Sequence, residues 1–346
     1  MVASSVGIGW IPDWCLCHQN SFGTITSAEP RSPLAWVILP AWLGTLLGSY
    51  AFDREVLPWL KWEQWLREVA ISWLLFIALW VVFLGAMLLM PYRFDDWRVW
   101  LIASVVIGLS LAFQYGASVC LLACFGWLQP PSERLARIVG ETSTRLGVPV
   151  RRTWLMRGSA SAAYALPTTG ELLFSERLLE THPDDEVAAI CAHELSHLNE
   201  PPRVLLGRLV GALVFVPFVF LHPASKLWHG LGLLVMLALM VGLIAFNRRL
   251  ARRMEHQADD VAAKNQGEAG TYARALARIY EINQMPAVMR GKPIHPHLYD
   301  RMLAAGVTPE FPRPQPPGRF SLNGVAILLL LAGLVAFLIT SHQSPI

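Results

Sequence analysis

The sequence has few charged residues for its length. Asp, Glu, Lys and Arg make up 15% of its 346 residues, whereas a soluble domain typically carries about 25%. Hydrophobic residues make up 54%, and the mean hydropathy is +0.42. The composition is therefore atypical of a soluble domain and predicts a chain that lies largely in lipid.

An excess of charge of one sign is also missing. The net charge is +3, and no basic cluster interleaved with aromatic residues occurs in the polar parts of the sequence. We therefore expect no nucleic-acid partner. The N-terminus lacks a basic region followed by an apolar core, so we also expect no cleavable signal peptide.

Cysteine is scarce and gives no sign of pairing. The five cysteines are Cys15, Cys17, Cys120, Cys124 and Cys191. Their number is odd and none forms a CxxC pair, so we expect no disulfide framework. Metal binding by the first two is a minor alternative, while Cys120 and Cys124 fit small residues that face lipid or pack in an apolar helix.

The sequence contains several long hydrophobic segments. A bilayer-spanning helix needs about 20 apolar residues, and six segments qualify. They are 34–52, 69–90, 99–128, 204–221, 227–246 and 322–340. The first contains Pro40 and Gly44, and the fourth is short and contains Arg208 and Pro217, so these two are the weaker candidates.

The basic residues set the expected orientation, because cytoplasmic loops carry an excess of Lys and Arg. If all six segments cross and the region around His193 is cytoplasmic, only four of the 28 basic residues fall on the outer side. They are Arg31, Arg93, Arg98 and Lys226. The opposite orientation would translocate most of the positive charge, so we expect the region around His193 to face the cytoplasm.

Two polar stretches between these segments carry helix and strand signals. In the first, 129–203, we expect a helix over 132–146, a strand over 148–156, two strands around the Pro-Thr-Thr-Gly turn of 162–175, and a helix over 183–199. Pro183 suits the first turn of the last helix, and Pro201 and Pro202 cannot continue it. In the second, 247–319, we expect helices to about 265, over 271–284 and near 297–305, followed by a proline-rich linker.

The run His193-Glu194-Leu195-Ser196-His197 lies in the middle of the helix expected over 183–199. Residues four apart share a helix face, so both histidines can present a ring nitrogen to one Zn²⁺. Glu194 can reach a metal-bound water, act as general base and pass the proton to the leaving amine. The alternative is that these histidines are ordinary polar residues of a surface helix.

A catalytic zinc site needs a third protein ligand beside an open position. Glu255 and Asp259 share one face of the helix expected after the fifth apolar segment, and the hairpin of the fourth and fifth segments returns the chain to the side of His193. Glu255 can bind the metal, and Asp259 can hold the second ring N–H of a ligand histidine. His256 is a rival ligand that points away from Glu255, and a solvated acidic face is the alternative.

The HELSH motif, a two-span hairpin and then RRMEHQADD resemble the family of integral-membrane zinc metallopeptidases that includes the CAAX prenyl endopeptidases and the heat-shock protease HtpX. The resemblance covers 132–303. It implies that Glu255 is the third ligand of one zinc ion per chain and that Glu194 is the catalytic base. A further family pattern matches His295, Pro296 and Arg301, which implies a transition-state donor or gate at His295 and a supporting role behind the ligands for Arg301.

The resemblance also implies a strand edge near 172–175 that pairs with an extended substrate backbone. The residues expected to contact substrate are Ala163, Tyr164, Leu172, Leu173 and Phe174. Ala162 stands where the family has Asn, which puts one substrate contact in question. Three apolar segments precede the protease region where the heat-shock members have two, so the substrates of those members cannot be carried over.

We therefore expect a mainly α, polytopic membrane protein with about six transmembrane helices and a small α+β zinc-metallopeptidase domain with a short β-sheet. The expected divisions are an N-terminal region with three spans at 1–128, the metallopeptidase domain at 129–308 with its hairpin at about 204–246, and a linker with the last span at 309–346. The expected partners are a polypeptide substrate and the lipid bilayer.

The expected function is a zinc-dependent endopeptidase that hydrolyses membrane or unfolded proteins at the cytoplasmic face of a bacterial inner (plasma) membrane, in protein quality control. A zinc-activated water attacks the peptide bond, with Glu194 as general base. One alternative is a sensor-type membrane metallopeptidase that cleaves a repressor in signalling. The other is a catalytically inactive membrane scaffold.

Overall fold

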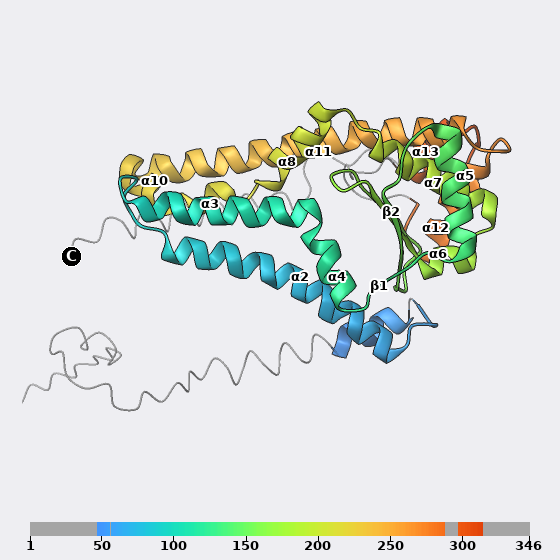
Figure 1. Ribbon diagram of the computed structural model, residues 1–346, viewed down its shortest axis with the longest axis horizontal. Coiled ribbons are helices and arrows are strands. Elements are labelled where there is room, and N and C mark those ends of the chain that lie inside the picture. Colours follow the sequence, from blue (N-terminus) through green and yellow to red (C-terminus); the bar gives the residue numbers. More distant parts are fainter. Residues whose placement is uncertain (1–46, 56, 288–296, 314–346) are drawn as a thin grey trace, which may run out of the picture. The chain divides into compact units, whose positions relative to one another are not determined.

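The computed structural model describes residues 47–55, 57–287 and 297–313 (Figure 1). The chain divides into two compact units, Met1–Phe52 and Asp53–Ile346. The described part of the second unit is mostly helical and contains one small mixed sheet of four strands. This confirms the mainly α class with a small α+β part.

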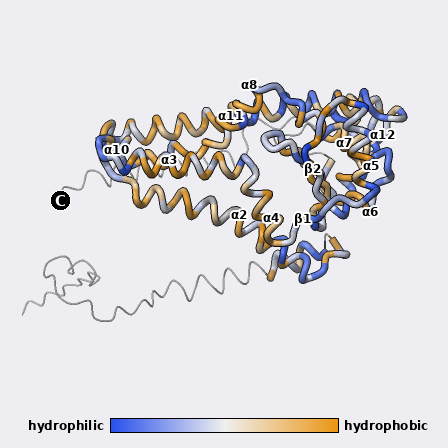
Figure 2. Tube along the Cα trace, in the orientation of Figure 1, coloured by the Kyte–Doolittle hydropathy of each residue, from blue (hydrophilic) through white to orange (hydrophobic). Residues whose placement is uncertain are grey.

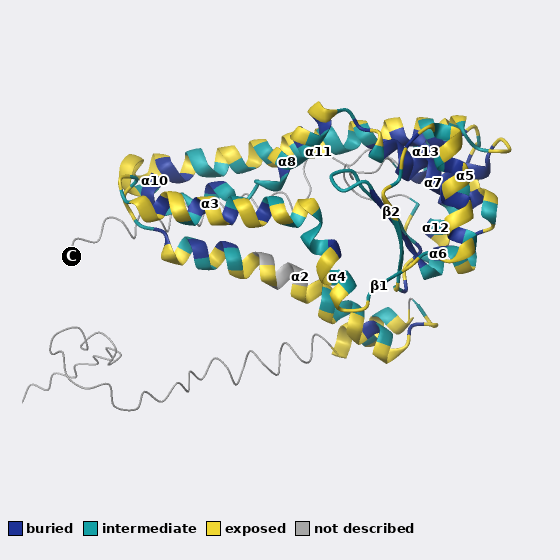
Figure 3. Ribbon diagram, viewed as in Figure 1, coloured by how far each residue is buried: buried dark blue, intermediate teal, exposed yellow. Residues whose placement is uncertain are grey.

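Apolar helices form one part of the second unit. They are α2 (Trp62–Leu89), α3 (Trp97–Ala112), the π-helical turn η2 (Phe113–Ala117), α4 (Ser118–Cys124), α8 (Pro202–Ala212), α9 (Val216–Val219), α10 (Leu221–Trp228) and α11 (Gly230–Lys264). Figure 2 shows that α2, α3 and the first half of α11 are largely hydrophobic, and Figure 3 shows that much of their surface is exposed. Exposed apolar helices whose backbone groups are bonded internally suit a lipid surrounding.

Three stretches of the described residues are long and apolar enough to cross a bilayer. They are Trp97–Cys124, Pro202–Val219 and Gly230–Lys264, which correspond to the third, fourth and fifth hydrophobic segments. In the second segment, Trp80–Leu89 is a shorter apolar stretch. Most of the first segment and all of the sixth lie outside the described residues, so six spans stay an expectation.

The stretch Trp97–Cys124 contains a kink at η2. Gly116 has a φ of 101°, a conformation that glycine adopts without steric cost, and a Cβ there would lie 3.0 Å from the Thr169 side chain. Thr168 donates a hydrogen bond to the Gln114 carbonyl at 2.5 Å. The kink therefore lies against the turn at 167–170, which joins two strands of the sheet.

The helix α11 is continuous over 35 residues, which corresponds to a length of about 52 Å. The fifth apolar segment and the helix with Glu255, treated as separate elements in the sequence, are one helix that runs into the polar part of the unit (Figure 1). The helix α8 packs closely against α11. At Gly211 the two helices are so close that a Cβ would lie 2.5 Å from the Asn247 side chain. The position of Glu255 is thus coupled rigidly to the apolar helices.

The sheet has the strand order β1-β2-β4-β3. Its strands are β1 (Leu128–Gln129), β2 (Arg152–Met156), β3 (Ala163–Leu166) and β4 (Glu171–Ser175). The pair β2–β4 is parallel and the other two pairs are antiparallel. The two strands expected around the Pro-Thr-Thr-Gly turn are confirmed as β3 and β4.

The expectation that residues 172–175 offer a free strand edge is wrong. They belong to β4, which is paired on both sides, by β2 and by β3. Leu172 and Phe174 are fully buried, and Leu173 is 5% exposed. Their backbone groups already have partners in the sheet, and β3 is the edge strand next to β4, with β1 at the other edge.

The sheet and four helices enclose the main core. The helices are α5 (Glu133–Leu146), α6 (Glu176–Thr181), α7 (Asp184–Leu198) and α12 (Thr271–Ile282). The helix α13 (Leu298–Ala304) packs with α12 in a second buried cluster. The helix α5 has the expected limits, with the Ser132 side chain capping its start and Gly147 (φ 65°) ending it. The helix α7 packs against α5, α11, α12 and β3, so its second half is buried on all sides (Figure 3).

Candidate metal centre

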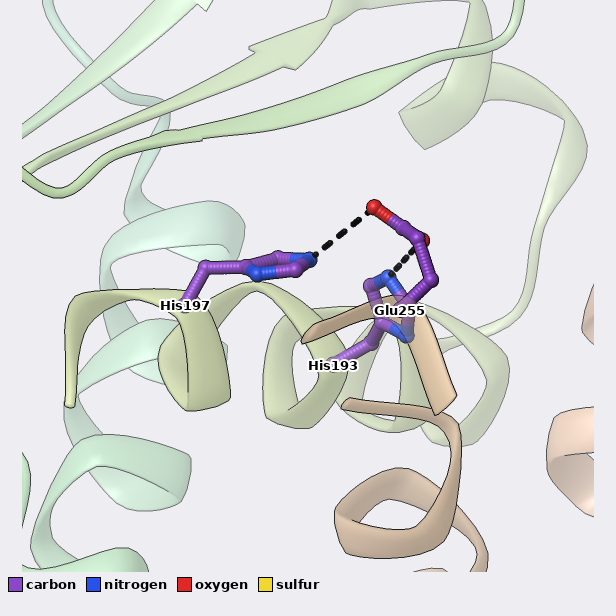
Figure 4. Close-up of side chains that lie close together, drawn as sticks. All are labelled: His193, His197 and Glu255. Carbon is purple, nitrogen blue, oxygen red and sulfur yellow. Dashed lines mark ion pairs between the residues drawn. The ribbon is translucent and has the colours of Figure 1, made fainter. Parts of the chain in front are cut away.

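The helices α7 and α11 bring three potential metal ligands together. His193 and His197 lie one turn apart on α7, and the Glu255 carboxylate on α11 faces both rings (Figure 4). The candidate ligand atoms all lie within 4.8 Å of one another, and the three residues are buried. The structure thus places His193, His197 and Glu255 side by side, whereas His256 lies exposed on another face of α11.

The spacing of these atoms fits a zinc ion. The Nε2 atoms of His193 and His197 each lie 3.5 Å from an oxygen of Glu255. Tetrahedral zinc with bonds of about 2.0–2.1 Å holds its ligand atoms about 3.3 Å apart. Two imidazoles and one carboxylate also form a usual donor set for catalytic zinc. The three side chains therefore suit zinc without rearrangement of either helix.

The second nitrogen of each ring is held by hydrogen bonds. His193 Nδ1 lies 2.8 Å from the Tyr272 hydroxyl and 3.2 Å from Asp259 Oδ1, and His197 Nδ1 lies 3.0 Å from Glu200 Oε1. An ionised carboxylate only accepts hydrogen bonds, so each Nδ1 carries the proton. Nε2 of each ring is then the nitrogen left for a metal, and it lies on the side that faces Glu255.

Asp259 is the centre of a buried network behind His193. Arg301 donates to both of its oxygens, at 2.8 Å and 3.0 Å, and the Tyr272 hydroxyl donates to Oδ1 at 2.7 Å. Arg301 also donates to the Tyr272 hydroxyl at 2.9 Å. Asp259 and Arg301 thus lie behind the cluster, in the places that their expected supporting roles require.

Protonation of His193 competes with metal binding. Burial lowers the pKa of His193, but its hydrogen bonds with the carboxylates of Asp259 and Glu255 outweigh burial and raise the pKa to about 9. At neutral pH the ring is therefore protonated in the metal-free protein. A metal ion that binds to Nε2 must displace this proton.

Two residues of the site were missed in the sequence. Tyr272 carries no motif, and only the packing of α12 against α7 brings its hydroxyl to His193. Glu200 lies three residues after His197, just beyond the end of α7 at Leu198, and this short separation along the chain was the available signal. Burial opposes ionisation of Glu200, but hydrogen bonds from His197 and Arg208 hold its pKa below the ordinary value.

Glu194 lines a cavity of about 250 Å³ together with His193, one of the three ligands. Ala163 and Tyr164 of the edge strand line the same cavity, and apolar residues of α12 form another wall. Burial and the negative charge of Glu194 both raise the pKa of Tyr164. Leu172, Leu173 and Phe174 are not among the lining residues.

Two expected site residues are not among the described residues that line this cavity, and a second, larger cavity is separate from it. His295 and Pro296 lie outside the described residues. A larger cavity of about 830 Å³, between the start of α2 and the loop after β2, contains none of the expected site residues. The expected site residues that line the smaller cavity are Ala163, Tyr164, His193, Glu194 and Arg301.

Comparison with known proteins gives the family. The model of Peptidase family M48 matches residues 130–316, more than half of the chain. A Protease HtpX homolog of Nostoc punctiforme is 29% identical over 205 residues, which cover 51% of this chain and 70% of that protein. One from Trichormus variabilis is 28% identical over 206 residues, with the same two coverages. The Protease HtpX of Legionella pneumophila is 23% identical over 175 residues, 44% of this chain and 60% of that protein. The chain therefore belongs to peptidase family M48 and is a metallopeptidase.

Proposed function

We propose that this metallopeptidase is a zinc endopeptidase that cuts membrane or unfolded proteins at the cytoplasmic face of a bacterial inner membrane. The observation that carries the proposal is the cluster of His193, His197 and Glu255, which opens beside the cavity of Glu194 and the edge strand β3. When bound there, zinc polarises the scissile carbonyl and lowers the pKa of water toward about 7.

The residues of the chain have separate tasks in this proposal. The carboxylate of Glu194 accepts a proton from the attacking water and delivers it to the nitrogen of the leaving amine. One water is consumed and one C–N bond is broken. Asp259, Tyr272 and Arg301 hold His193 in the tautomer that can bind the metal.

The edge strand β3 is the proposed binding site for the substrate backbone. The Ala162 carbonyl accepts a hydrogen bond from Ser175 of β4. Since the bonding direction alternates along a strand, Ala163 and Ala165 direct their N–H and C=O groups away from β4. An extended peptide can pair with them as an added strand, close to Glu194.

Removal of the metal tests the proposed function. The detergent-solubilised protein is expected to contain about one zinc ion per chain and to cleave an unfolded membrane protein. A chelator should abolish cleavage, and added zinc should restore it, because the remaining side chains supply no comparable electrophile. Metal analysis and gel assays measure both effects. Absence of zinc from the purified protein, or cleavage that persists after the metal is stripped, would contradict the proposal.

We also propose six membrane crossings and the division into 1–128, 129–308 and 309–346. The three apolar stretches support this topology. Four arginines that follow the apolar half of α11, on the side of Glu255, support the cytoplasmic orientation of this end, because basic residues accumulate at cytoplasmic ends. They are Arg248, Arg249, Arg252 and Arg253.

Cysteine labelling tests the orientation. In a cysteine-free background, an impermeant maleimide is expected to label Asp95→Cys in intact cells, because Asp95 lies in the loop between α2 and α3. It should label Glu141→Cys, on an exposed position of α5, only after the cells are opened. The reverse pattern would place the metal centre on the outer side.

A further inference from the structure

Arg208 is a charged side chain in the middle of α8, inside the apolar stretch Pro202–Val219. Ionisable residues in membrane spans are costly, face the protein interior, pair with an opposite charge and commonly mark function. The side chain of Arg208 is 30% exposed. Its guanidinium donates to Glu200, from Nε at 2.6 Å and from Nη2 at 2.5 Å.

The Glu200 carboxylate joins this arginine to the metal centre. Its side chain is 2% exposed and lies at the corner between α7 and α8, directly before Pro201 and Pro202. Both oxygens accept from Arg208, and Oε1 also lies 3.0 Å from His197 Nδ1. A forked arginine–carboxylate pair fixes orientation as well as distance, so the His197 ring meets an acceptor that is itself held in place.

The two histidines have parallel supports on different parts of the fold. Behind His193, Asp259 is held by Arg301, which lies on α13 in the polar part of the unit. Behind His197, Glu200 is held by an arginine on the apolar helix α8. The second support extends from the metal centre into the apolar stretch Pro202–Val219.

We infer that Arg208 and Glu200 are positioning residues for the metal. Arg208 holds the Glu200 carboxylate, and Glu200 keeps His197 in the orientation and tautomer that present Nε2 to the ion. The inference rests on the proposed role of His197 as a ligand. It makes the apolar helix α8 a structural part of the metal centre, in addition to a membrane crossing.

We call the chain of contacts from Arg208 through Glu200 to His197 the relay. It is tested by the zinc affinity of the purified full-length protein, measured by competition with a chelator. Arg208→Gln and Glu200→Gln should each weaken zinc binding about 10–100-fold, the usual effect of losing a partner behind a ligand. Arg208→Lys keeps the positive charge but loses the two-nitrogen contact with Glu200, so the loss of zinc affinity should be smaller than in Arg208→Gln. The double variant should bind zinc as tightly as the single variant with the lower zinc affinity, because both residues act through one set of contacts.

The matched control is Arg203→Gln, an exposed arginine on the same helix, which should bind zinc like the wild type. Visible absorption of the Co²⁺-substituted protein gives a second readout, since a reoriented His197 should shift the bands of the bound ion in Glu200→Gln and leave them unchanged in Arg203→Gln. Circular dichroism of the metal-free variants checks folding. If Glu200→Gln does not fold, the comparison of Arg208→Gln, Arg208→Lys and Arg203→Gln still decides.

The outcomes separate this inference from the proposed function. Wild-type affinity in both Gln variants, additive losses in the double variant, or an equal loss in Arg203→Gln would each overturn the relay. If His197→Ala releases zinc while Glu200→Gln and Arg208→Gln retain it, the relay alone fails. If the wild type binds no zinc, the proposed function fails.

Discussion

Replacing Glu194 by glutamine is expected to lower kcat about 10²–10⁴-fold, the range that a positioned general base contributes. The amide has the same shape but cannot accept the proton from water. His193, His197 and Glu255 are unchanged by this substitution, so bound zinc should stay at the wild-type level. Initial rates on an unfolded membrane-protein substrate and metal analysis of the same samples measure the two quantities.

The control for this variant is Glu141→Gln on α5, where the carboxylate is 67% exposed and lies outside the cavity of Glu194. Its rate should equal that of the wild type. Equal rates for Glu194→Gln and the wild type would remove Glu194 from the mechanism. A large loss of zinc in Glu194→Gln would instead show that Glu194 acts through the metal.

Glu255→Ala is expected to release the metal and with it the activity. A zinc site with two protein ligands lacks the third that catalytic sites retain. The affinity should therefore fall by more than the roughly 10–100-fold that loss of a partner behind a ligand costs. Chelator competition measures the difference, and the rates should follow the fraction of protein that still holds zinc.

The neighbouring histidine gives this variant a close control. His256 follows Glu255 on α11 but is exposed, so His256→Ala should keep zinc and activity. If Glu255→Ala kept all its zinc and His256→Ala lost it, His256 would be the third ligand in place of Glu255. Full zinc in both would show that the third ligand lies elsewhere.

Local signals in the sequence predicted the elements that short-range physics controls. Ser132 and Gly147 mark the ends of α5 as expected, and Pro183 precedes α7 and Pro201 follows it. The four-residue spacing of His193 and His197 sets their common face regardless of the surrounding fold. These features depend on neighbours along the chain, which a single sequence displays.

Features that depend on distant contacts were not predictable in the same way. Both β3 and β4 are short and apolar, and only the pairing of β4 with the distant strand β2 leaves β3 at the edge. The change from apolar to arginine-rich sequence near Asn247 resembled the end of an element, yet the backbone of α11 continues through it. The contact of Tyr272 with His193 joins residues 79 positions apart, and no local pattern announces it.

Under the proposed topology, the unbroken helix α11 also fixes how far from the bilayer the chemistry takes place. Its apolar half ends near Phe246, before the arginines, and Glu255 follows about 13 Å further along the helix axis. Sliding the helix through the membrane would carry Glu255 away from α7, so a thicker or thinner bilayer has to be accommodated by tilt. A substrate anchored in the same membrane would need at least about four extended residues beyond its own apolar segment to reach the cavity. Under the proposed function, the length of a substrate's juxtamembrane tether would then select substrates independently of their side chains.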